Sequence, residues 1–116
     1  MRIPALLQKL EFVGQAEGDR RTYYVFQGSA GYVVASANGP SGLNVSIVGK
    51  EFLEAITRRF RGRQVTTSLI VQKSRRPRVL GLRFAALNAL YVMVALGAAR
   101  KLKKHDGKAM VFKIKR

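Results

Sequence analysis

The chain contains no cysteine and no tryptophan, and its 116 residues include only 6 acidic side chains and 1 histidine. The absence of cysteine excludes disulfides and thiolate-bound metal sites. The acidic residues show neither paired-carboxylate nor metal-ligand spacing. The adjacent His105 and Asp106 have no serine or cysteine at a spacing that would complete a nucleophilic site. We therefore predict that the protein is not an enzyme, has no catalytic residues, and needs no metal or other cofactor.

Long hydrophobic runs are also lacking. The first residues, MRIPALLQKLEFVG, offer only a few consecutive apolar side chains, too few for the core of a signal peptide. The longest uncharged stretch, residues 84–99, holds sixteen residues, whereas a membrane-spanning helix needs ~20. We expect this stretch to be a buried helix. We expect the protein to be cytoplasmic, or nuclear in a cell with a nucleus, and not to enter a membrane.

Positive charge is what the chain has in excess. Its 22 lysine and arginine residues give a net charge of +16. Residues 1–50 carry five basic and three acidic side chains, for +2, whereas residues 51–116 carry seventeen and three, for +14. Such an excess indicates a polyanionic partner, first nucleic acid and second an anionic membrane surface. The binding surface should therefore lie mainly in the second half of the chain.

The first half shows a pattern of short strands. Hydrophobic residues make up 47% of the chain, which favours one folded domain over disorder. Residues 4–12 predict a short amphipathic helix, and residues 14–21 predict a polar connector. Strand-like runs then follow over 22–27, 31–37 and 43–48, separated by glycine-rich turns. This half therefore predicts a small antiparallel β-meander with three strands.

The second half changes to a helical period. Residues 50–62 place apolar side chains on one stripe, with acids in the first turns and arginines in the last. Residues 65–74 suit either a short helix or a strand. Residues 75–78 are a break because proline disfavours a helix in the residue before it. Residues 82–97 predict a buried helix that ends at a Leu-Gly pair.

The last residues predict a hairpin around an Asp-Gly turn, for which two registers are open. With 106–107 alone at the tip, Leu102 and Val111 face away from Phe112, which splits the apolar residues between the two faces. With a three-residue loop over 105–107, one face becomes mainly apolar and most lysines point outward. We prefer this second register, which pairs Leu102 with Met110, Arg100 with Phe112 and Ala98 with Ile114.

The order helix, short helix, longer helix and hairpin resembles that of a winged helix-turn-helix domain, over roughly residues 50–116. The segment AALNALYVMVALGAARKLKKHDGKAMVFKI, residues 85–114, carries most of the resemblance. It implies an α+β fold, in which a small antiparallel β-meander precedes a winged helix-turn-helix with a C-terminal hairpin as its wing. The whole chain, 1–116, would be a single domain, with the predicted helix and meander in residues 1–49. Domains of this kind occur in transcription factors, chromatin proteins and some ribosomal proteins of archaea and eukaryotes.

The resemblance implies that the third helix starts near the nucleic acid. Along this helix only Arg83, Asn88 and Tyr91 are able to hydrogen-bond base edges, so recognition of phosphates and shape is favoured over sequence readout. Positive charge is concentrated instead in the loop before the helix and on the wing. We predict that phosphates are bound by Arg75, Arg76, Arg78, Arg83, Lys101, Lys103, Lys104, Lys108, Lys113 and Lys115.

Aromatic residues of the meander offer a second mode of contact. Tyr23, Tyr24 and Tyr32 are candidates for stacking on bases, although packing in the core is the alternative. Our prediction is a non-enzymatic protein that contacts the backbone of structured RNA in a ribosome-like particle, beside other proteins of that particle. Two alternatives stay open: a winged-helix regulator or chromatin protein that binds DNA, and an adaptor that binds another protein.

Overall fold

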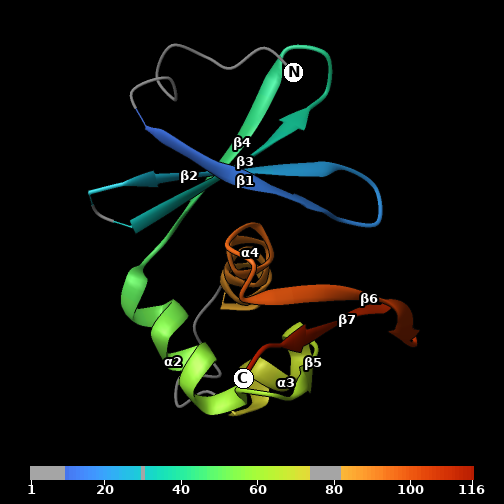
Figure 1. Ribbon diagram of the computed structural model, residues 1–116. Helices are drawn as coiled ribbons and strands as arrows, with labels where there is room; N and C mark the ends of the chain where they lie inside the picture. Colours follow the sequence, from blue (N-terminus) through green and yellow to red (C-terminus); the bar gives the residue numbers. More distant parts are fainter. Residues whose placement is uncertain (1–9, 30, 74–81) are drawn as a thin grey trace.

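A computed structural model of the protein describes residues 10–29, 31–73 and 82–116. The first half of the described chain forms a four-stranded antiparallel sheet in the order β1-β2-β3-β4, in which each strand pairs with the next along the chain (Figure 1). The predicted α+β class and antiparallel meander are confirmed. The strands are β1 (Glu11–Glu17), β2 (Thr22–Gly28), β3 (Gly31–Asn38) and β4 (Gly42–Val48).

Strand β1 corrects two predictions. Residues 14–21 were expected to be a connector, but the strand includes Gly14 and runs to Glu17, so the meander has four strands rather than three. The alternation of β1 is hard to see in the sequence because only Ala16 is buried and the register shifts after Phe12. The helix expected over 4–12 is wrong at its end, which belongs to β1, and its first part lies outside the described residues.

The second half forms a smaller antiparallel sheet, in the order β5-β7-β6, together with helices. The ambiguous segment 65–74 contains both alternatives, because Val65 ends a two-residue strand and a helix follows. Thr66 caps the start of that helix, since its Oγ1 accepts a hydrogen bond from the backbone N–H of Leu69 at 3.2 Å. The elements are α2 (Lys50–Phe60), β5 (Gln64–Val65), α3 (Thr67–Lys73), α4 (Leu82–Ala95), β6 (Ala99–Asp106) and β7 (Ala109–Ile114).

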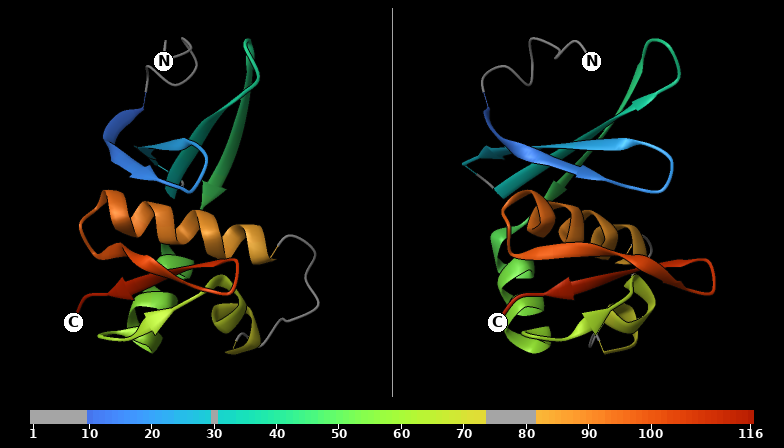
Figure 2. Two further views of the ribbon diagram at one scale, coloured as in Figure 1. Left: turned by 90° about the vertical axis from the view of Figure 1, so that its right-hand side faces the viewer. Right: turned by 45° about the vertical axis from the view of Figure 1, so that its right-hand side comes forward.

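Helix α4 lies between the two sheets and forms the centre of the core (Figures 1 and 2). Leu90 and Val92 are fully buried, as expected for a helix that is apolar all round. Toward the meander, the ring of Tyr91 stacks on Tyr23 with centroids 4.0 Å apart. Toward the smaller sheet, Tyr91 meets Phe112 edge to face. Both sheets therefore pack against one helix.

No described helix has the length and hydrophobicity to cross a membrane.

The hairpin of β6 and β7 does not have the preferred register. Ala99 pairs with Ile114 and Lys101 with Phe112, which is the register set aside above, and a shift follows between Lys101 and His105. At the tip the turn is Gly107–Lys108, flanked by paired residues on either side. The split of apolar residues is tolerated because β7 is the central strand of its sheet, and side chains on both of its faces are buried.

Candidate nucleic-acid interface

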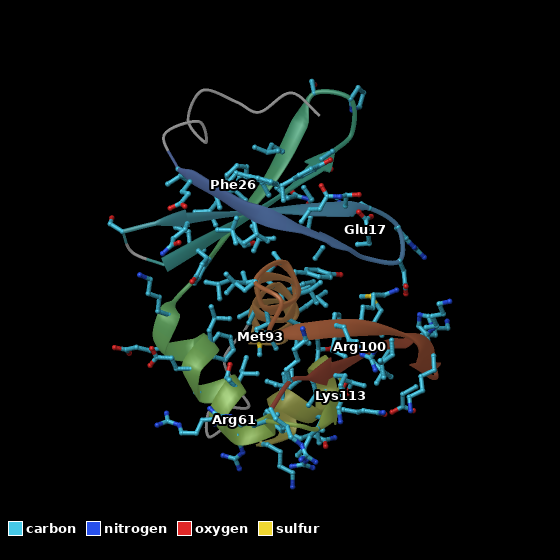
Figure 3. The ribbon with its side chains drawn as sticks, in the orientation of Figure 1. Glu17, Phe26, Arg61, Met93, Arg100 and Lys113 are labelled. Carbon is cyan, nitrogen blue, oxygen red and sulfur yellow. The ribbon has the colours of Figure 1, made fainter. Side chains whose placement is uncertain are left out.

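The charge of the protein is divided between its two layers. In the described meander, residues 10–48, two basic side chains (Arg20 and Arg21) are outnumbered by three acids (Glu11, Glu17 and Asp19). Most side chains that end in nitrogen atoms (blue in Figure 3) lie instead around α2, α3 and the hairpin. The positive charge is therefore concentrated in the layer that begins at α2.

These cations are almost entirely without internal counter-charges. Among the lysines and arginines whose side chains are described, Lys101 alone has a carboxylate within salt-bridge distance, at 3.0 Å from Asp19. The remaining basic side chains repel one another unless solvent ions or a ligand neutralise them. A surface of this kind favours a polyanion over a small or neutral ligand.

Five basic residues lie on the smaller sheet or in the segments that directly adjoin its strands; we call this group the basic sheet face. Arg100 and Lys113 are cross-strand partners on the side of the sheet that faces away from α4, and Gln64 of β5 continues their row. Lys113 donates a 2.6 Å hydrogen bond from Nζ to the carbonyl oxygen of Gly62, which fixes the α2–β5 turn beside the strand. The basic sheet face consists of Arg63, Arg100, Lys113, Lys115 and Arg116.

Two further contacts hold this surface together. The guanidinium of Arg63 lies 5.7 Å from the centre of the Phe60 ring, a cation–π contact that restrains the side chain. Gly62 has a φ of +76°, and a Cβ there would meet the Arg116 side chain at 3.1 Å. The turn therefore brings the end of α2 and the end of the chain to the same place.

The hairpin tip carries a second group of cations. Lys103, Lys104 and Lys108 are exposed, as predicted from the sequence, and extend the basic surface away from the core. Lys115 is likewise exposed, whereas Lys113 is half-buried by its contact with the Gly62 turn. These lysines remain candidates for phosphate contacts.

Lys101 differs from the other predicted binding residues. It was expected on the outer face of the hairpin, but the observed register places it beside Phe112 on the side that faces α4. There it pairs with Asp19 of the β1–β2 turn, and His105 Nε2 lies 3.0 Å from the same carboxylate. Hydrogen bonds from Lys101 first and His105 second hold the pKa of Asp19 below its ordinary value. The carboxylate that contacts His105 is therefore that of Asp19. Asp19, Lys101 and His105 together link the two sheets.

Asp19→Asn should destabilise the protein at neutral pH but hardly in acid. Because the folded pKa of Asp19 lies below the ordinary value of 3.8, its stabilising effect is complete above that value and is lost as the pH falls through the folded pKa. Urea unfolding should therefore give free energies of unfolding for the two proteins that converge as the pH falls through the folded pKa of Asp19. Glu11→Gln is the control, since no basic group pairs with Glu11 in the described structure. A difference in stability between wild type and Asp19→Asn that stays constant as the pH falls from neutral to strongly acidic would contradict the prediction.

Part of the predicted site cannot be compared with the structure. Arg75, Arg76 and Arg78 lie outside the described residues, and so does the side chain of Arg83. Conversely, Arg63, Arg100 and Arg116 of the basic sheet face were not among the predicted residues. Arg100 was missed because the preferred register placed it on the buried face with Phe112. Arg63 carries a signal in the sequence, since it directly follows the glycine that ends a helix with arginines in its last turn.

The tyrosines predicted to stack on bases do not lie on one face of the meander. Tyr23 and Tyr32 face α4, and Tyr23 already has the ring of Tyr91 against it. Tyr24 lies on the opposite face with Phe26. Burial, and then the neighbouring Tyr23, raises the pKa of Tyr91 above its ordinary value, so this hydroxyl stays neutral. These three tyrosines therefore do not form a row of rings on which successive bases could stack.

Comparison with known proteins finds no family model, no curated protein and no solved structure that matches this chain.

Proposed function

We propose that this protein binds nucleic acid without catalysing a reaction, and that its main ligand is the phosphate backbone of structured RNA. The observation that carries the proposal is the uncompensated charge of the layer from α2 to the chain end. Only one described lysine or arginine is neutralised by an acid within the protein. Phosphates that replace solvent ions at these cations would supply the binding free energy through counterion release.

We also propose that residues 50–116 form a winged helix-turn-helix unit. The order α2, β5, α3, α4, β6, β7 supports this, since it is the order of helices and wing strands in that family. The strand order β5-β7-β6 supports it too, because the strand between the helices pairs with the last strand of the wing. In this arrangement α4 is the third helix, and the hairpin of β6 and β7 is the wing.

The burial of α4 favours RNA over sequence-specific DNA recognition. A third helix that reads DNA lies in the major groove with several side chains on base edges. Here the meander covers one side of α4 and the smaller sheet covers the other, and Leu90, Tyr91 and Val92 are buried. The exposed cations lie on α2, at the end of α3, in the turns and on the hairpin instead. Contacts to phosphates and to helix shape, which are the usual mode for structured RNA, suit this surface.

The ribonucleoprotein proposal is tested by sedimentation of a native lysate. The protein should move with large particles, because its cations would be neutralised by RNA in an assembly. Treatment with RNase should shift it to light fractions, whereas DNase should not. Sedimentation that RNase leaves unchanged would contradict the proposal, and a shift with DNase alone would favour a chromatin protein.

The two alternatives make different predictions with purified protein. A winged-helix DNA regulator should bind duplex DNA more tightly than structured RNA of the same length and should prefer one sequence. A protein-binding adaptor should hold its partner with little dependence on salt, because apolar contacts are not screened by ions. The exposed side chains of Phe12 and Ile47 on the meander are the observation that favours this last alternative.

A further inference from the structure

A groove of about 450 Å³ lies between the meander and the first turns of α4. This volume is within the range of about 300–1,000 Å³ that small-molecule sites occupy. The stacked rings of Tyr23 and Tyr91 form part of its lining. On the strand side, the polar residues Ser36, Asn44 and Ser46 line it together with Val34 and Val45. The groove lies apart from the basic sheet face, which none of its lining residues belongs to.

Phe84 is a large apolar residue of α4 that is exposed to solvent. Its side chain is 72% exposed, whereas Leu90 and Val92 of the same helix are fully buried. It lines the groove together with Leu87 and Asn88 of the same helix. An exposed phenylalanine beside polar groups offers a flat face on which a planar ligand can stack.

The polar groups around Phe84 match the edge of a nucleobase. Among the residues that the structure describes, the side-chain amide of Asn88 has no hydrogen-bond partner. Asn44 accepts a hydrogen bond on Oδ1 from Nδ2 of Asn38 at 3.3 Å, and its own NH₂ group is left to donate. Each carboxamide presents a donor and an acceptor side by side, as base edges do. Two such groups beside one aromatic ring suit a base better than an aliphatic ligand.

Arg21 adds a cation to the groove. Its Nη1 donates a hydrogen bond to the carbonyl oxygen of Ala37 at 3.2 Å, which holds the guanidinium across the end of β3. A guanidinium has five N–H donors, so this contact leaves others for a phosphate. Arg21 has no carboxylate within salt-bridge distance among the described residues.

We propose that this groove binds one unpaired nucleotide of the RNA. The base stacks on Phe84, its edge meets the amides of Asn88 and Asn44, and Arg21 binds the phosphate. The nucleotide must be unpaired, because a base within a duplex has its edge and faces occupied. This subsite rests on the proposed RNA binding, which the basic sheet face supports separately.

The test compares a short blunt RNA duplex with the same duplex carrying one bulged adenosine. Wild type should bind the bulged RNA more tightly, and Phe84→Ala should weaken that binding by roughly 5- to 150-fold, the range for one base stacked on an aromatic ring. Binding of the blunt duplex should change by less than about twofold. Ile47→Ala is the matched control, because Ile47 is also 72% exposed but faces away from α4. Equal losses on both RNAs, or no loss on either, would overturn the proposal.

The role of Arg21 has its own control in the neighbouring residue. Arg21→Gln and Arg20→Gln each remove one charge from the same turn, but only Arg21 lines the groove. Arg21→Gln should weaken binding of the bulged RNA more than Arg20→Gln does, and equal effects would overturn the phosphate contact. Wild type that binds neither RNA would contradict the proposed function as a whole. Wild type that binds both with equal affinity would contradict the groove proposal alone.

Discussion

Phe112→Ala should lower the free energy of unfolding by roughly 3–5 kcal/mol, the range for truncating a buried phenylalanine. The ring is completely buried between β7 and α4, and it contacts Tyr91 edge to face with centroids 6.2 Å apart. Its loss leaves a cavity beside the helix that both layers share. Chemical denaturation followed by circular dichroism would measure the change.

Lys113 on the same strand and Lys115 directly after it provide the controls. Lys115→Ala should change stability by less than about 0.5 kcal/mol because the side chain is exposed. Lys113→Ala should cost about 1 kcal/mol, since it removes the hydrogen bond to the Gly62 carbonyl. Equal destabilisation by Phe112→Ala and Lys115→Ala would mean that the register of the hairpin is wrong.

Removing four charges from the basic sheet face should weaken RNA binding by roughly 30-fold to several hundred-fold at moderate salt. The estimate assigns about 0.5–1 kcal/mol to each exposed charge contact with a phosphate. The variant replaces Arg63, Arg100, Lys115 and Arg116 with glutamine. Lys113 is kept because it fixes the Gly62 turn. Affinities for several RNA hairpins of different sequence, measured by fluorescence anisotropy, should fall by similar factors.

The comparison for this variant is Arg20→Gln, which removes the same kind of charge from the meander. On a logarithmic scale, Arg20→Gln should lower the affinity for RNA by less than one quarter of the amount by which the quadruple variant lowers it. Loss of binding to one hairpin alone would indicate base readout and would favour the DNA-regulator alternative. Unchanged affinity would mean that the basic sheet face does not contact the RNA.

Helices were predictable where apolar spacing alone determines them. The stripe of Leu53, Ile56 and Phe60 predicted α2, and all three are buried in the structure. The apolar run of α4 likewise predicted a buried helix. Strand β1 was missed because a glycine and several polar residues leave Ala16 as its single buried position.

The candidate site was less predictable because it depends on contacts between distant residues. The hairpin was predicted as a two-stranded ribbon with one buried face. In the structure β5 pairs with β7, so that β7 is the central strand of a three-stranded sheet. The true register brings Arg100 to the outer face and turns Lys101 toward Asp19, far away in the sequence. The groove at Phe84 also depends on the packing of β3 and β4 near α4, which no local pattern reveals.

The central claim is that phosphates are held by cations that lack partners within the protein. The most direct measurement is the slope of the logarithm of the binding constant K against the logarithm of the salt concentration. It is measured for one structured RNA with wild type and with the quadruple variant. Five phosphate contacts from the basic sheet face alone give a wild-type slope of roughly −3.5 to −4.5, at ~0.7–0.9 per contact. The variant should be flatter by about four contacts' worth. A wild-type slope near zero, or the same slope for both proteins, would contradict the account.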